Sequence, residues 1–126
     1  MKLTKTDIND CYIVEWDRMD DNRGFFNVSF NTEEFYNKTG IDFKIIQENE
    51  SMSKKGVIRG LHFQKPPYEQ AKLVRCVYGQ VLDVIVDIRP DSTSYGKVVT
   101  VQLNGGLRRS VFVPRGCAHG FSTKNR

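Results

Sequence analysis

Two histidines lie in segments whose residue types could perform acid–base chemistry. His62 is in GVIRGLHFQKPPYEQ, residues 56–70, which begins as an apolar strand and runs into a Pro-Pro turn. His119 is in PRGCAHGF, which also follows a strand-like run and a proline turn. A histidine titrates near neutral pH and can act as a general base. Because both histidines are expected at strand ends, the sequence predicts one site built from two distant segments.

Strand alternation adds a lysine and an aspartate to this site. In residues 81–88, Asp83 falls on a face with apolar neighbours, where its charge is costly unless a histidine, lysine or arginine partners it. In residues 71–77, Lys72 could point the same way, and its charge could stabilise a developing enolate. Together with the histidines, this set favours proton abstraction next to a carbonyl group. The plainer alternatives are a surface ion pair and two hydrogen-bonded core histidines.

A metal site is the chemical alternative. The order of His62, Gln64, Glu69 and His119 resembles the two motifs of cupins. Metal-binding cupins use a His-x-His pair, a glutamate and a later histidine, and here Gln64 replaces the second histidine of the pair. Two imidazoles and one carboxylate could still form a facial triad. A metal-dependent cupin, such as an oxygenase or isomerase, therefore stays open, although the sequence favours a site with no metal and no cofactor.

The elements that must position these residues are short strands. Apolar runs separated by turns that contain glycine and proline, with almost no helical periodicity, predict an all-β sandwich or barrel. Residues 32–38 resemble the start of a short helix, and residues 43–51 read as half strand and half polar. The expected strands cover residues 11–16, 24–30, 57–63, 71–77, 81–88, 97–103 and 107–113. We expect one domain over residues 1–126.

The composition excludes several classes of function. The chain is 39% hydrophobic and 27% charged with a net charge of +4, and no basic stripe with interleaved aromatic residues occurs, so no nucleic-acid partner is expected. A mildly positive cavity would suit an anionic small molecule. No apolar run approaches membrane length, and the start of the chain has no apolar signal region. The three cysteines show no C-x-x-C spacing, so we expect reduced thiols and a cytoplasmic protein.

Six motifs together indicate a family. The chain resembles the dTDP-4-dehydrorhamnose 3,5-epimerases, which are cofactor-free cupin enzymes. The matching motifs are DNRGFF (21–26), QENES (47–51), GVIRGLHFQ (56–64), QAKLVRCVYGQVLDVIVDIR (70–89), STSYGK (92–97) and VPRGCAHGF (113–121). The resemblance implies a double-stranded β-helix, or jelly roll, that is usually dimeric. It also implies epimerisation of dTDP-4-dehydro-6-deoxy-D-glucose at C3 and C5, in dTDP-L-rhamnose or related deoxysugar biosynthesis.

The resemblance assigns the catalytic roles. His62 matches the base that removes the protons flanking the 4-keto group, and Lys72 matches the group that stabilises the enolate oxygen. Asp83 and His119 match polar residues inside the barrel that the family keeps close to the site. We therefore expect Asp83 to belong to the catalytic set and His119 to the substrate-binding set.

The resemblance also assigns residues that bind the nucleotide sugar. Arg59, Gln47 and Asn49 match residues that line the sugar and phosphate pocket. Arg23 resembles an arginine that reaches the nucleotide diphosphate from the neighbouring subunit. Phe26 is close in the sequence to the position of the family's aromatic residue near the nucleotide. These residues imply a nucleotide-sugar ligand and a homodimer.

Two departures from the family pattern affect these expectations. Val28 stands where the family commonly has a thymine-contacting glutamate, and residues 122–126 do not resemble the usual continuation. That continuation supplies a tyrosine as the general acid and an aspartate that orients the histidine. Tyr68 and Asp83 are the available substitutes within 126 residues. If 126 residues is the whole molecule, we expect substrate binding through Arg59, Lys72 and Arg23 and slow deuterium exchange that depends on His62, with little epimerised product. The alternative is a truncated, non-catalytic cupin that binds nucleotide sugars.

Strand geometry makes a prediction about the segment that carries His62. Arg59 and His62 are three residues apart, so a regular strand would send them to opposite faces. If both serve one pocket, the strand must break its alternation between them. Gly60 is the obvious position for such a bulge.

The N-terminal strands make a prediction about assembly. They carry large apolar side chains at an exposed end of a small barrel, namely Trp16, Phe25, Phe26 and Phe30. An apolar surface of this kind is rarely left exposed to solvent. We therefore expect a dimer in which these strands are exchanged and Arg23 crosses into the partner's site.

Overall fold

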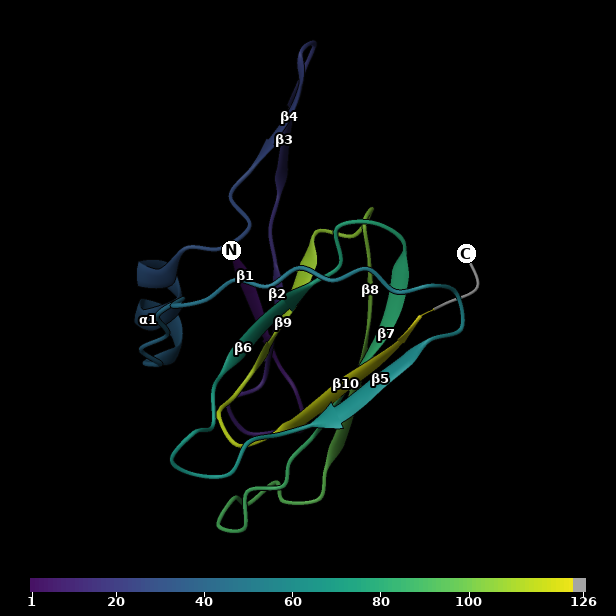
Figure 1. Ribbon diagram of the computed structural model, residues 1–126. Coiled ribbons are helices and arrows are strands. Elements are labelled where there is room, and N and C mark those ends of the chain that lie inside the picture. The colour runs from purple at the N-terminus through teal and green to yellow at the C-terminus, as the bar shows by residue number, and fades with distance from the viewer. Residues whose placement is uncertain (124–126) are drawn as a thin grey trace.

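Two four-stranded antiparallel sheets face one another and form a β-sandwich (Figure 1). The computed structural model describes residues 1–123. The first sheet contains, in spatial order, β1 (Lys2–Lys5), β2 (Tyr12–Glu15), β9 (Arg109–Val113) and β6 (Lys72–Arg75). The second sheet contains β5 (Ile58–His62), β10 (Ala118–Thr123), β7 (Gln80–Val86) and β8 (Val98–Asn104). The chain passes between the sheets at β5–β6, β6–β7, β8–β9 and β9–β10, so the predicted all-β jelly roll is confirmed.

The core lies between the two sheets. Ile85 on β7 and Leu103 on β8 are fully buried, and they pack with Val111 and Val113 of β9 in the opposite sheet. Alternate residues of each strand face this core, as the pleat of a strand requires. Burying each such aliphatic side chain contributes roughly 1.5–3 kcal/mol, which makes this cluster the main source of stability.

The outer face of the first sheet is covered by the helix α1 (Thr32–Thr39), which lies beside that sheet in Figure 1. Phe35 of the helix is buried against Phe112 of β9, with ring centroids 4.8 Å apart. The side chain of Asn31 caps the first turn at 2.9 Å, and Gly40 ends the helix with a positive φ of 75°. The helix predicted at residues 32–38 is confirmed.

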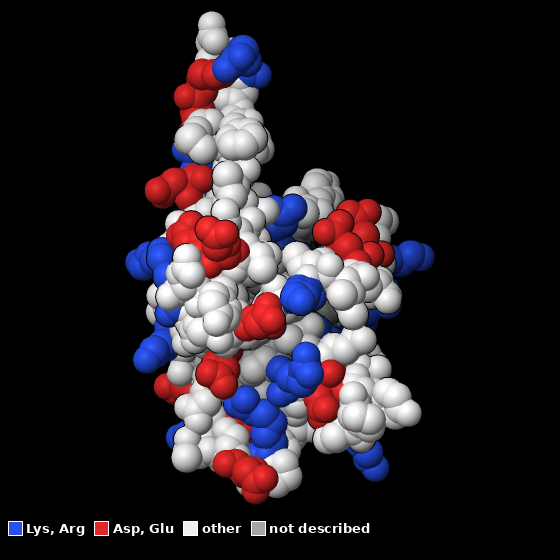
Figure 2. All heavy atoms as spheres, turned by 90° about the vertical axis from the view of Figure 1, so that its left-hand side faces the viewer, with Lys and Arg blue, Asp and Glu red and all other residues white. Residues whose placement is uncertain are grey.

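A separate hairpin extends from the sandwich. Its strands β3 (Arg18–Asp21) and β4 (Gly24–Asn27) pair only with each other. Figures 1 and 2 show the hairpin standing clear of the body, with charges of both signs at its tip. The sequence predicted a polar turn between two strands, but half of that polar segment is itself strand. Polar residues pair here because the hairpin is in solvent, where the pairing needs no apolar face.

The N-terminal aromatic residues divide into two groups. Phe25 and Phe26 on the hairpin are each 63% exposed, as expected. The prediction was wrong for Trp16, which is 8% exposed, and for Phe30, which packs on Phe35 with ring centroids 5.3 Å apart. These two residues flank the hairpin in sequence and fold back onto the body.

Three further elements differ from the sequence-based expectation. Residues 43–51 contain no strand, because Ile46 is 84% exposed and no neighbouring strand pairs with this segment. Strand β1 was not predicted, and neither was β10, so His119 lies inside a strand and not at a strand end. Strand β10 has little apolar alternation and forms because it pairs with β7 on one side and β5 on the other. In the part of the chain that the structure describes, no helix is long and apolar enough to span a membrane.

Candidate active site

An extra residue in β5 breaks the alternation of that strand. His62 pairs with His119 and Arg59 pairs with Phe121, so three steps along β5 match two steps along β10. Residues that lie directly opposite each other in a ladder share a face of the sheet. Arg59 and His62 are therefore on the same face, as predicted. Gly60 lies inside the bulge with φ of 99°, a conformation that favours glycine.

The shared face is the inner face of the second sheet. His119 pairs with Ile85 on β7, and Ile85 belongs to the core between the sheets. Asp83 is two residues from Ile85 on the same strand and is fully buried. The register thus places Arg59 and His62 on the same side as His119, Ile85 and Asp83. The two distant histidine segments do form neighbouring parts of one surface.

Asp83 and His119 form a buried pair. The ring nitrogen Nε2 of His119 is hydrogen-bonded to both carboxyl oxygens of Asp83, at 2.8 and 2.9 Å. Burial raises the pKa of Asp83, while the hydrogen bond and charge of His119, and more weakly the charge of Lys72, work to lower it. The prediction that Asp83 needs a basic partner is confirmed. No hydrogen bond in the described residues joins Asp83 to His62, so Asp83 does not act as the orienting partner of that histidine.

Lys72 faces the site from the opposite sheet. It pairs with Val113 on β9, whose side chain lies in the core, so Lys72 is on the inner face of the first sheet. Its charge lowers the pKa of Asp83, yet residues 1–123 contain no ion pair or side-chain hydrogen bond of Lys72. The alternative of a surface ion pair between the two residues is therefore wrong. The ammonium group remains available for a ligand.

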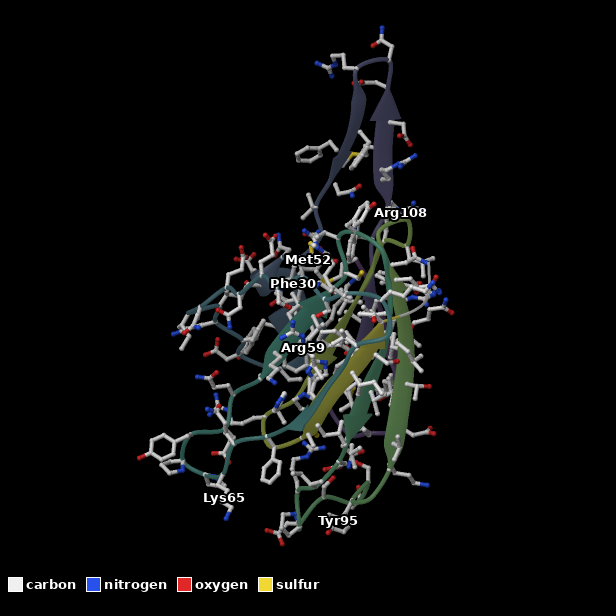
Figure 3. All side chains as sticks on the ribbon, turned by 45° about the vertical axis from the view of Figure 1, so that its right-hand side comes forward. Phe30, Met52, Arg59, Lys65, Tyr95 and Arg108 are labelled. Atoms are coloured by element: carbon white, nitrogen blue, oxygen red, sulfur yellow. The ribbon has the colours of Figure 1, made fainter. Side chains whose placement is uncertain are left out.

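Arg59 is held by the segment that precedes β5. Its Nε donates to Ser53 Oγ at 2.8 Å, and its Nη2 donates to the carbonyl of Met52 at 3.3 Å. Figure 3 shows Arg59 in the middle of the body, below Met52. Gln47 and Asn49 are exposed in the same segment and hydrogen-bond to each other at 2.9 Å. Ser53 was not singled out in the sequence, and no signal beyond its place near the QENES motif could have identified it.

Comparisons with known proteins identify the family. A family model described as dTDP-4-dehydrorhamnose 3,5-epimerase matches residues 5–126. The chain belongs to this epimerase family. A dTDP-4-dehydrorhamnose 3,5-epimerase of Shigella flexneri is 49% identical over 121 residues, which cover 96% of this chain and 67% of the relative. The resemblance inferred from the motifs is therefore confirmed.

Solved structures of the epimerase family share the fold. The epimerase of Elizabethkingia anophelis superimposes with a TM-score of 0.95 at 44% identity, covering 98% of this chain and 68% of that one. The 3,5-epimerase of Legionella pneumophila, in complex with dTDP-4-keto-L-rhamnose, gives a TM-score of 0.89 at 40% identity and covers 98% and 65%. The chain thus spans about two thirds of the length of these epimerases.

Two residues that the epimerase resemblance assigned to the nucleotide lie far from His62 within this chain. Arg23 is at the hairpin tip, where its side chain is 86% exposed and pairs with Asp21. Phe26 is on the same hairpin and is also exposed. The hairpin leaves the body, so one chain does not bring these residues to the histidine surface.

The histidine surface is open. Every residue of β5 is exposed to solvent, and two cavities of about 470 and 490 Å³ lie elsewhere. The first cavity is at the root of the hairpin beside Trp16 and Arg108, and the second is beside Tyr78 and Gly105. Arg59 and His62 are therefore on an exposed part of the sandwich.

The residues considered as metal ligands do not gather. Among residues 1–123, no three His, Cys, Asp or Glu side chains are close enough together to hold a metal ion. The set of His62, Glu69 and His119 is therefore not assembled, and the imidazole of His119 is already bonded to Asp83.

Proposed function

We propose that this protein epimerises dTDP-4-dehydro-6-deoxy-D-glucose at C3 and C5, without a metal or cofactor. The observation that carries the proposal is the register of β5, which puts Arg59 and His62 on one inner face while Lys72 faces them from the other sheet. The names of its epimerase relatives support the same substrate class. A cytoplasmic location agrees with the three free cysteines of the chain.

The reaction needs a base beside a ketone. The imidazole of His62 takes the proton from the carbon next to the 4-keto group. The electron pair of the broken C–H bond then forms a C=C bond, and the carbonyl oxygen becomes an enolate. The ammonium group of Lys72 stabilises that negative oxygen, which is where charge develops in the transition state. A proton delivered from solvent water to the opposite face of the carbon inverts the centre and regenerates the ketone, and His62 gives the proton that it took to the hydroxide left behind.

Binding residues surround this chemistry. The guanidinium group of Arg59 suits a phosphate oxygen, because charge-assisted hydrogen bonds of arginine to phosphate are strong. Gln47 and Asn49 can offer amide groups to the sugar hydroxyls. His119 is held in one orientation by Asp83, so its ring forms a fixed part of the floor of the site.

We further propose that two copies of the chain share their sites. The hairpin exposes Met19, Phe25 and Phe26, and a lone two-stranded hairpin is only marginally stable in water. A two-fold dimer would cover these apolar side chains and bring Arg23 and Phe26 to the partner's histidine surface. This arrangement would supply the nucleotide contacts that a single chain lacks.

Incubation of the keto-sugar nucleotide in deuterium oxide tests the proposal. We expect deuterium at C3 and C5, detected by NMR, and its loss in His62→Asn. In Lys72→Met we expect the exchange rate to fall by about 10²–10³-fold, the range for removing a group that stabilises a developing oxyanion. The exposed Lys97 provides a matched control as Lys97→Met.

Three outcomes would contradict the epimerase proposal. Nucleotide-sugar binding with no exchange at either carbon would indicate a non-catalytic cupin. Exchange that persists in His62→Asn would reject this histidine as the base. Stoichiometric iron, zinc or manganese in the active protein would favour a metal-dependent enzyme.

A further inference from the structure

Gly120 lies directly against the bulge of β5. A Cβ atom added to Gly120 would be 2.5 Å from the carbonyl oxygen of Arg59 and 3.2 Å from the Cα atom of Gly60. A Cβ atom on Gly60 would meet the Cα atom of Gly120 at 2.8 Å and the carbonyl oxygen of His119 at 2.8 Å. Real Cβ atoms essentially never come within 3.0 Å of such neighbours. The two strands therefore approach this closely only because neither residue has a side chain.

The two glycines are needed for different reasons. Gly60 has a positive φ of 99°, so its backbone conformation alone disfavours other residues. Gly120 is not among the residues with positive φ, and an alanine there would keep an ordinary backbone conformation. The cost of an alanine at position 120 is thus confined to its contact with β5. This makes Gly120→Ala a specific probe of the approach of the two strands.

A Cβ atom at position 120 would displace strand β5 and not strand β10. Strand β10 is held on its other side by six residue pairs with β7, from Ala118↔Val86 to Thr123↔Val81. Among residues 1–123, strand β5 is at the edge of the sheet and pairs only with β10, and it is exposed along its whole length. A side chain at position 120 would consequently push β5 away, and β5 carries both Arg59 and His62.

We propose that Gly120 is a positioning residue for Arg59 and His62. By lacking a side chain it accommodates the bulge that turns both residues to the inner face. Gly120 touches no reacting atom and acts only through β5. The proposal rests on the proposed role of His62 as the base.

The test compares Gly120→Ala with Gly106→Ala. Gly106 lies in the turn between β8 and β9, and its added Cβ atom would meet only Asn104 Oδ1, at 3.4 Å. We expect Gly120→Ala to lower deuterium exchange by about ten- to a hundredfold, because a displacement of about 1 Å can cost 10²-fold in rate. Gly106→Ala should keep the rate of the unaltered protein. Full exchange activity in Gly120→Ala would overturn the proposal.

A second measurement reports position without activity. The chain has only two histidines, so two imidazole signals are expected in NMR spectra, and His62→Asn assigns them. In Gly120→Ala the signal of His62 should shift more than that of His119, because Asp83 holds the ring of His119. An unchanged His62 signal would contradict the proposal. If the unaltered protein shows no exchange, the epimerase proposal fails, but these signals still decide whether Gly120 positions His62.

A deletion covers the case in which Gly120→Ala does not fold. Removing Gly60 removes the extra residue of the bulge, so Gly120→Ala should then be tolerated. We expect the protein without Gly60 to melt at the same temperature with glycine or alanine at position 120, as measured by circular dichroism. A double variant that unfolds while the deletion alone stays folded would overturn the proposal. Unfolding of both the deletion and the double variant would also overturn the proposal, because the bulge would then be required for folding and not for positioning Arg59 and His62.

Discussion

The two histidines have opposite surroundings, and this difference separates their roles. His119 is 8% exposed and its Nε2 is bonded to the buried carboxylate of Asp83. His62 is at the end of an exposed edge strand and has no hydrogen-bonded side-chain partner within residues 1–123. A base that collects protons from a ligand needs an accessible nitrogen. This difference supports the proposed role of His62 in proton transfer and a structural role for His119.

The Asp83–His119 pair leads to a prediction about pH. A carboxyl group whose pKa is raised in the folded state loses its proton less easily there than in the unfolded chain. Its contribution to the free energy of unfolding therefore falls as the pH rises above the unfolded value. His119→Ala removes the hydrogen bond and charge that oppose the raised pKa of Asp83. We expect this variant to lose about 3–5 kcal/mol near pH 7, as for a broken buried pair, and less near pH 5.

Urea unfolding at pH 5 and pH 7 measures this effect. The matched control carries Asp83→Asn as well as His119→Ala, so that no ionisable group remains at the pair. In this control the pair makes no pH-dependent contribution to the free energy of unfolding, so any remaining change between the two pH values comes from other groups. An equal loss at both pH values in His119→Ala alone would show that the charge of Asp83 is not the cause.

At the scale of elements, the sequence predicted the strands whose apolar residues face the core and missed those formed by pairing alone. The alternation in β7 correctly placed Asp83 on the buried face, and the spacing of Arg59 and His62 correctly required a bulge. Strand β10 is rich in small and polar residues, so only its two neighbouring strands reveal it. The contact between Gly60 and Gly120 depends on this pairing. Local patterns therefore could not show it, although a glycine inside a strand is a known sign of close backbone approach.

The end of β7 carries a second buried carboxylate that supports the fold. Asp87 is fully buried and accepts hydrogen bonds from Arg89 at 2.9 Å, Ser92 at 2.6 Å and Ser94 at 2.5 Å. Burial works to raise the pKa of Asp87, but these hydrogen bonds outweigh it and hold that pKa well below its usual range. The turn from β7 to β8 is thus fastened to the barrel through one ionised side chain.

Asp87→Asn should therefore destabilise the protein in a pH-dependent way. A carboxylate with a lowered pKa contributes stability above the pKa of the unfolded chain, and this contribution is lost as the pH falls through and below that value. We expect a loss of about 3 kcal/mol at pH 7 and a smaller loss below about pH 4. Urea unfolding at both pH values measures it, with Asp91→Asn in the same turn as the exposed control. A loss that does not depend on pH would assign the effect to packing.

At the scale of the whole molecule, the proposed dimer predicts that two defective chains can repair each other. His62→Asn removes the base, and Arg23→Ala removes the arginine that the hairpin would deliver to the partner. When the two variants are mixed and allowed to exchange subunits, some dimers contain one site with both residues intact. We expect exchange activity to rise well above that of either variant alone, as measured in deuterium oxide.

A control for this experiment mixes His62→Asn with Lys72→Met. Both changes lie in the body of the chain, so each mixed dimer has one altered residue in each site and gains no intact site. Light scattering at micromolar concentration checks that dimers form. A monomer, or a mixture of His62→Asn and Arg23→Ala that is no more active than its components, would contradict the shared site.

The detached hairpin has a consequence for how substrate choice can change over evolutionary time. Residues 18–27 pair only with each other, so substitutions there are not restrained by the packing of their own barrel. If the hairpin binds the nucleoside while the barrel binds the sugar ring, the preferred nucleobase can change without any change to the residues that transfer protons. Exchanging the hairpin between relatives would then transfer the nucleotide preference together with this one segment.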